Sequence, residues 1–127
     1  MSWFLQFLVS GVVILVLDLF WLTVVANKFY RSVLGGIMRE KASLPPAVIF
    51  YILYLVGLTV FVTAPAVSVA AAFGYGALFG LVAYGTYDLT NAATLKVWAT
   101  KLTVVDMLWG ALLSSLAAGI ARAVISG

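Results

Sequence analysis

Four stretches of this chain are each long and apolar enough to cross a lipid bilayer as a helix. A transmembrane helix needs about 20 predominantly apolar residues to span the ~30 Å hydrocarbon core. The stretches that meet this requirement are residues 2–26, 45–64, 69–93 and 102–124. We therefore expect four transmembrane helices in one domain of residues 1–127, with residues 27–44 forming the longest connection.

The composition excludes an ordinary water-soluble domain. Hydrophobic residues make up 65% of the 127 residues and charged residues only 9%, whereas soluble domains are about 45–50% apolar and about 25% charged. A soluble fold of this size would leave large apolar patches in water. The lipid bilayer is therefore the expected solvent and partner, and the predicted fold class is all-α, an integral membrane four-helix bundle.

The distribution of lysine and arginine predicts the orientation of the bundle. Six basic residues lie in the two connections that join spans one to two and three to four: Lys28, Arg31, Arg39, Lys41, Lys96 and Lys101. Arg122 alone lies toward the opposite side. By the positive-inside rule, both termini are expected on the non-cytoplasmic side. No basic run is dense enough to follow a phosphate backbone, so nucleic acid is not an expected partner.

The connection 27–44 contains a short amphipathic pattern. Apolar residues recur at helical spacing (Phe29, Tyr30, Val33, Leu34, Ile37), and polar residues occupy the other face (Lys28, Arg31, Ser32, Arg39). Gly35 and Gly36 would weaken or end a helix there. The pattern predicts a short interfacial helix followed by a turn. A plain linker whose charges only set the topology is the alternative.

Three aspartates lie inside the predicted spans: Asp18, Asp88 and Asp106. An aspartate at the centre of a membrane helix costs about 2.5–3.5 kcal/mol on insertion scales, so each needs a compensating environment. Counting 1.5 Å per residue from the span ends puts all three roughly 6–12 Å from the cytoplasmic boundary. We expect them to converge on one polar pocket that opens to the cytoplasm.

Other polar and aromatic residues lie near the acids in the predicted helices. In span three, Ala72, Gly76, Gly80, Tyr84 and Asp88 follow at four-residue steps and form one face. Gly76 and Gly80 are a small-xxx-small pair that lets helices approach closely, within the chain or in a dimer. The candidate ligand-binding residues are Asp18, Trp21, Tyr51, Tyr54, Tyr84, Tyr87, Asp88, Asn91, Asp106 and Trp109.

The chain has no cysteine and no histidine. This excludes disulfides, thiolate or imidazole metal sites, haem ligation and nucleophilic catalysis that depends on histidine or cysteine. We expect no metal and no cofactor, and the absence of these groups weighs against an enzyme. A purely structural role for the acids is also open, in which they bond to neighbouring helices or pair with Lys96 and Lys101.

Two short motifs carry a family resemblance. The segments 84–91 (YGTYDLTN) and 106–110 (DMLWG) resemble a family of small bacterial membrane proteins catalogued as domain of unknown function 2177, and the likeness covers nearly the whole chain. The resemblance implies four membrane helices in a bacterial inner membrane. It brings no established activity, substrate or catalytic residue with it.

Three functions stay open from the sequence. The favoured one is a small transporter or solute-binding protein, in which the aspartates bind a cation, proton or polar solute. A membrane enzyme or accessory protein acting on lipids is the second, since paired carboxylates can serve as acid and base or hold Mg²⁺. The third is a structural subunit of a larger membrane complex, and a homodimer is compatible with the first.

Overall fold

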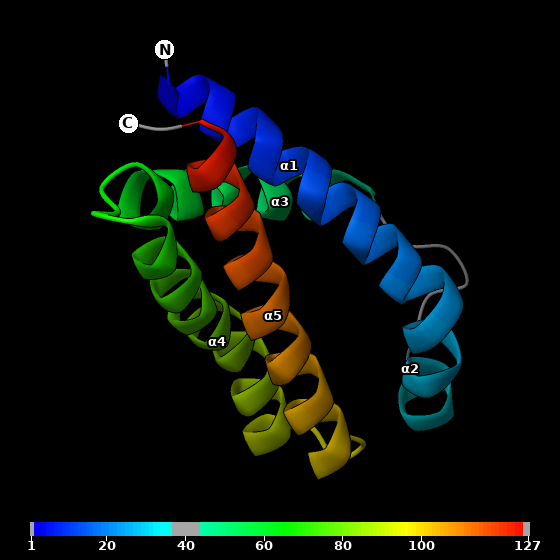
Figure 1. Cartoon of the computed structure of the whole chain (residues 1–127). Coiled ribbons are helices and arrows are strands. Elements are labelled where there is room, and N and C mark those ends of the chain that lie inside the picture. Colours follow the sequence, from blue (N-terminus) through cyan, green and yellow to red (C-terminus); the bar gives the residue numbers. More distant parts are fainter. Residues whose placement is uncertain (1, 37–43, 126–127) are drawn as a thin grey trace.

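The computed structural model describes residues 2–36 and 44–125, which contain helices and no strand. Four of the helical stretches are long and apolar enough to cross a membrane: Ser2–Val24, Leu44–Thr63, Val69–Thr94 and Thr100–Val124. Together with their helical connections they confirm the predicted all-α membrane fold. The first turn of α1 and the last turn of α5 lie at the same end of the molecule (Figure 1).

Seven helical elements make up the described chain. They are α1 (Ser2–Phe20), the π-helix η1 (Trp21–Ala26), α2 (Asn27–Leu34), α3 (Leu44–Leu58), the π-helix η2 (Thr59–Thr63), α4 (Val69–Thr94) and α5 (Thr100–Val124). Helix α2 follows η1 directly and ends at Leu34, and the N–H of the next residue, Gly35, donates to the carbonyl of Arg31 at 2.9 Å. Ile37, Arg39 and Lys41 of the predicted interfacial segment lie outside the described residues.

The connection between the second and third spans is fixed at both of its ends. It follows η2 and contains Pro65, and α4 then begins with Ser68 as its N-cap. The Ser68 hydroxyl accepts a hydrogen bond from the backbone N–H of Ala71 at 3.0 Å, which satisfies one of the unpaired donors of the first turn. Arg122 of α5 donates to the carbonyl of Ala66 at 3.3 Å. This arginine therefore holds the connection against the end of α5.

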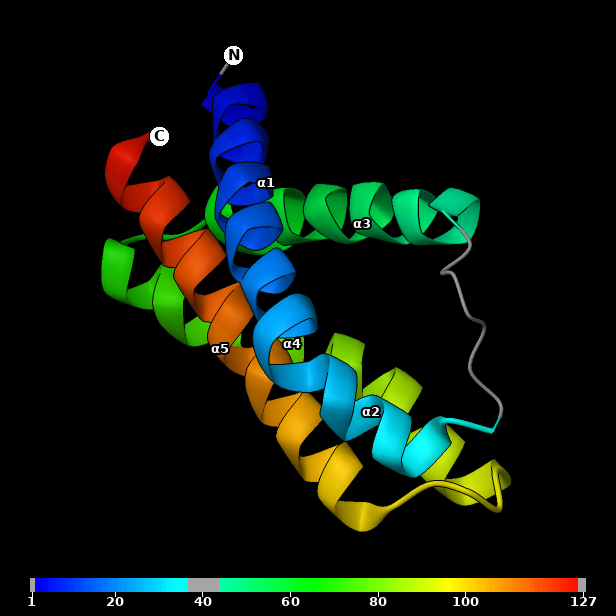
Figure 2. The same cartoon turned by 90° about the vertical axis from the view of Figure 1, so that its right-hand side faces the viewer.

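The most extensive contact in the molecule joins α4 to α5, which run side by side in Figures 1 and 2. The two helices are antiparallel in this contact. Every fourth residue along α4 faces a residue of α5 that lies four positions closer to the N-terminus of α5 than the one before. The facing pairs are Gly76 with Ala118, Gly80 with Ser114, Tyr84 with Gly110 and Asp88 with Asp106. The face of the third span that is formed by residues at four-residue steps thus packs against a matching face of the fourth span.

Glycine is required at the centre of this contact. A Cβ atom added at Gly80 would lie 2.1 Å from the carbonyl oxygen of Gly110 and 2.4 Å from the hydroxyl oxygen of Ser114. A Cβ atom at Gly76 would lie 2.8 Å from the carbonyl oxygen of Ser114. Both glycines therefore lie within the α4–α5 contact of one chain.

The other spans pack around the α4–α5 pair. Helix α1 lies beside α5, and η2 contacts α1, α4 and α5. Helix α3 is inclined to α1 and α5 in both ribbon views (Figures 1 and 2). Its Tyr54 packs against the rings of Phe79 and Tyr84 on α4. The buried apolar core lies where these elements meet and includes Ile14 and Leu58.

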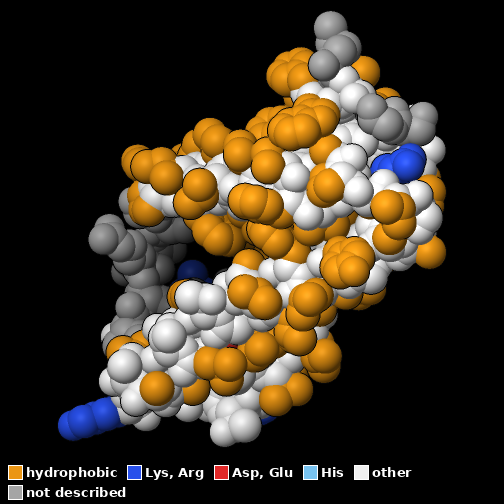
Figure 3. Space-filling model, turned by 90° about the vertical axis from the view of Figure 1, so that its left-hand side faces the viewer, with side chains coloured by type: hydrophobic (Ala, Val, Ile, Leu, Met, Phe, Trp, Pro, Cys, Tyr) orange, Lys and Arg blue, Asp and Glu red, His pale blue; other side chains and the backbone are white. Residues whose placement is uncertain are grey.

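The outer surface is suited to lipid. Hydrophobic side chains are spread over the face seen in Figure 3, and lysine or arginine side chains are visible at its edges and in the hollow at its left. Large apolar side chains such as Leu53 and Phe61 are exposed on the second span. A helix that is apolar on its outer as well as its inner face is typical of a membrane span.

We predict that Gly80→Ala destabilises the protein by about 1–3 kcal/mol, because the added methyl group must push α4 away from α5. The measurement is the free energy of unfolding of detergent-solubilised protein during titration with a denaturing detergent. Gly74→Ala is the matched control, since a Cβ atom at Gly74 meets no atom within 4 Å. Equal stability of the two variants would contradict the proposed close contact.

Candidate functional site

A cavity of about 730 Å³ lies between the first span, α2, α3, α4 and α5. All three aspartates inside the spans line it, together with seven aromatic side chains. The complete lining is Asp18, Trp21, Leu22, Leu34, Phe50, Tyr51, Ala83, Tyr84, Thr86, Tyr87, Asp88, Thr90, Trp98, Asp106 and Trp109. Within this lining no residue is a lysine or an arginine.

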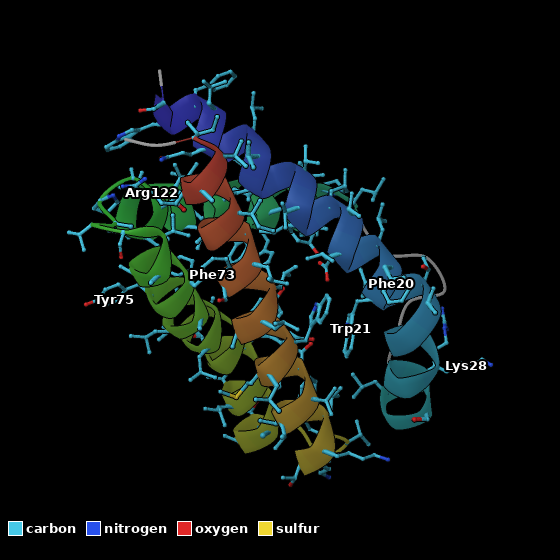
Figure 4. The ribbon with its side chains drawn as sticks, viewed as in Figure 1. Phe20, Trp21, Lys28, Phe73, Tyr75 and Arg122 are labelled. Atoms are coloured by element: carbon cyan, nitrogen blue, oxygen red, sulfur yellow. The ribbon has the colours of Figure 1, made fainter. Side chains whose placement is uncertain are left out.

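Asp18 is held in place by two side-chain donors from other helices. The indole N–H of Trp109 donates to Oδ1 at 3.1 Å, and the Tyr51 hydroxyl donates to Oδ2. Trp109 also stacks on Trp21, with ring centroids 4.4 Å apart and ring planes at 8°. Trp21 points from the first span toward α5 in Figure 4. These contacts tie α1, α3 and α5 together and use one donor on each oxygen of Asp18.

Asp88 is in a different environment. Its side chain is fully buried, and neither carboxylate oxygen accepts a hydrogen bond from the described residues. The carboxyl group of Asp106 faces it from α5. A buried carboxylate without a donor is costly in an apolar medium. Asp88 therefore needs a proton or a bound cation to compensate its charge.

Aromatic rings form much of the remaining wall. Tyr87 meets Trp98 edge to face, with centroids 5.6 Å apart. The indole N–H of Trp98 donates to the hydroxyl of Thr103 at 2.8 Å, which fixes the ring at the start of α5. Tyr84 lies over Gly110, where an added Cβ atom would be 2.2 Å from the tyrosine ring. Packing thus holds these rings around the acids.

The structure brings eight of the ten candidate residues to the cavity and leaves two outside its lining. Tyr54 is buried beside the cavity, and its hydroxyl shares a hydrogen bond with Ser114. Asn91 lies near the end of α4, where its backbone carbonyl accepts from the N–H of Leu95 at 2.9 Å. The eight that line the cavity are Asp18, Trp21, Tyr51, Tyr84, Tyr87, Asp88, Asp106 and Trp109.

Several lining residues were not among the candidates. Trp98 lies between Lys96 and Lys101, a position where an interfacial tryptophan is common, so the sequence offers no separate signal for a cavity role. Leu34 and Phe50 are apolar residues whose place in the wall depends on how α2 and α3 pack. Among the described residues, no group of three acidic side chains lies close enough to hold a metal ion.

We predict that Tyr51→Phe lowers the free energy of unfolding by about 1 kcal/mol, because Asp18 loses a buried hydrogen-bond donor. Denaturing-detergent titration of the purified protein measures the change. Tyr75→Phe is the matched control, since the Tyr75 side chain is 64% exposed and points away from the neighbouring helices (Figure 4). If the two variants lose the same stability, the Tyr51–Asp18 bond does not stabilise the fold.

The model of a family described as predicted membrane protein (DUF2177) matches residues 3–123. Neither a curated protein nor a solved structure matches the chain at a significant level.

Proposed function

Because the chain belongs to the DUF2177 family of predicted membrane proteins, and because its spans enclose an acidic aromatic cavity, we propose that it binds a small organic cation. As a multi-pass membrane protein, it would use this site to carry the cation across the bilayer. The observation that supports this most is the state of Asp88, a buried carboxylate that accepts no hydrogen bond from the described residues.

The charge of the cavity favours a cation. Three carboxyl groups line it, and no lysine or arginine of the described chain does so. Asp18 already has a donor on each oxygen, whereas neither oxygen of Asp88 accepts a hydrogen bond from the described residues. A ligand with one positive charge would therefore be held mainly by Asp88, with Asp106 facing it from α5.

The aromatic lining favours an organic cation over a bare metal ion. Faces of tryptophan and tyrosine rings attract ammonium groups within about 6 Å, and this attraction strengthens when the partners are removed from water. Trp98, Tyr84 and Tyr87 supply such rings close to the acids. A volume of about 730 Å³ lies within the range of small-molecule sites. The apolar groups of an alkylated amine would contact the apolar and aromatic side chains that line the cavity.

We predict that purified wild-type protein binds choline and that Asp88→Asn weakens this binding at least about tenfold, because the amide keeps the shape but removes the charge. Quenching of tryptophan fluorescence measures binding, since three tryptophans line the cavity. Asp18→Asn is the matched charge control, and a smaller loss is expected because donors occupy both of its oxygens.

A neutral ligand of the same shape separates charge recognition from simple apolar binding. The compound 3,3-dimethyl-1-butanol replaces the quaternary nitrogen of choline by carbon, and we expect it to bind much more weakly than choline. Equal affinity for the two compounds would refute a cation site. Unchanged choline affinity in Asp88→Asn would show that the aspartate pair does not hold the ligand.

We also propose that the protein lies in a bacterial inner membrane, as the family resemblance implies. Both termini should lie outside, since basic residues concentrate in residues 28–41 and 96–101. The chain has no native cysteine, so single cysteines can be labelled without background. In intact spheroplasts, a membrane-impermeant maleimide should label Val67→Cys at once and Lys96→Cys only after lysis. The reverse pattern would overturn the orientation. Both positions are exposed.

A further inference from the structure

Several hydrogen-bond donors in the wall of the aspartate cavity serve acceptors other than Asp88. The hydroxyl groups of Thr86 and Thr90 on α4 donate to backbone carbonyls of their own helix. As a result, neither oxygen of Asp88 has a donor among the described residues. The other donors of the wall that bond elsewhere are Tyr51 and Trp109, which donate to Asp18, and Trp98, which donates to Thr103.

The titratable groups around Asp88 do not offset a negative charge on it. Asp106 faces it from α5, and Tyr87 is its electrostatic neighbour on α4. In the lining formed by the described chain, α2 contributes no titratable group and no helix contributes a lysine or an arginine. Like charges held close together disfavour each other. The remaining titratable groups of the lining are Asp18 of α1, Tyr51 of α3 and Tyr84 of α4.

The empty cavity therefore favours a neutral Asp88. Its side chain forms part of the cavity wall and is fully buried there. An ionised carboxylate in such a place costs far more free energy than a neutral carboxylic acid, unless a positive charge or hydrogen-bond donors accompany it. The fold supplies neither to the Asp88 oxygens among the described residues. A proton on the carboxyl group removes the cost when no cation is bound.

We infer that a proton and an organic cation compete for Asp88, so that each cation bound in the cavity releases one proton. This inference rests on the proposed cation site and names what occupies Asp88 when the cation is absent. On binding, the O–H bond of the carboxyl group breaks and the proton passes to water. The ammonium group then takes its place beside the carboxylate. One positive charge enters and one leaves, and the proton returns when the cation departs.

Competition of this kind would couple the two ions in a carrier. The proton-occupied and cation-occupied states have the same net charge in the cavity, so both are compatible with burial among apolar side chains. A carrier built on this site would move one proton in one direction for each cation that it moves in the other. A pH gradient across the membrane would then drive the movement of the cation.

The first test counts the protons released when choline binds to the purified full chain. Choline chloride is added at saturating concentration to protein in weakly buffered detergent solution at neutral pH, and a pH indicator reports the protons. We expect about one proton per choline bound for the wild type, and almost none for Asp88→Asn, because the amide has no acidic proton to release. Asp18→Asn is the matched charge comparison and should still release about one, since donors already occupy both oxygens of Asp18.

The second test follows the choline affinity as the pH changes. Fewer protons compete for Asp88 as the pH rises, so the wild-type affinity should increase by up to about tenfold per pH unit. The weaker affinity of Asp88→Asn should change much less over the same range. Quenching of tryptophan fluorescence measures both variants. A wild-type affinity that is independent of pH would overturn the competition.

The third test examines the empty site and needs no choline, so it decides even if Asp88→Asn binds too weakly to be saturated. A protonated carboxyl group has a carbonyl stretching band in the infrared that an ionised carboxylate lacks. We expect such a band in ligand-free wild-type protein, its absence from Asp88→Asn, and its loss from the wild type after choline is added. If the ligand-free wild type and Asp88→Asn have the same bands, Asp88 is not protonated and the exchange is wrong.

Failure of the exchange can be told apart from failure of the cation site. Wild-type protein that binds choline without releasing protons would refute the exchange alone. Release of one proton per choline by Asp88→Asn would also overturn it, since another group would then supply the proton. Wild-type protein that binds no choline would refute the cation site, and the exchange would fall with it.

Discussion

The close contact between α4 and α5 determines the arrangement of the remaining structure. In a bilayer, apolar surface gives little drive for helices to associate, so close packing and hydrogen bonds must supply it. Gly76 and Gly80 remove the side chains that would keep the two helices apart. The resulting register then places Asp88 opposite Asp106 two turns farther along. A packing requirement in the apolar half of the bundle therefore positions the charged pair in the other half.

The same fold places chemically identical side chains in two environments. Asp18 has donors from α3 and α5 on its two oxygens, so it acts as a junction between helices. Asp88 has no such donor in the described structure. The two aspartates differ because their neighbours differ. Tyr51 and Trp109 donate hydrogen bonds to Asp18, whereas Asp88 faces the carboxyl group of Asp106. We therefore expect Asp88, whose oxygens lack donors in the described structure, to take part in function. We expect Asp18, whose oxygens both have donors, to stabilise the fold.

Much of the fold could be predicted from the sequence, because span length and the four-residue steps of α4 are local properties. The pairing of those steps with α5 could not, since register depends on contacts between residues distant in the chain. For the same reason the sequence did not show that Tyr54 bonds to Ser114 rather than lining the cavity, or that Trp98 joins the wall. The spacing of Gln6, Ser10 and Asp18 on one face of α1 was a visible signal of its buried side.

The contact of Tyr84 with Gly110 has a consequence for how such a chain can vary. The tyrosine ring fills the space that any side chain at position 110 would need. The two positions therefore share one volume between α4 and α5, and a larger residue at 110 is compatible only with a smaller one at 84. Among related sequences these positions should change together, and such paired changes would reshape the cavity while leaving the outline of the bundle intact.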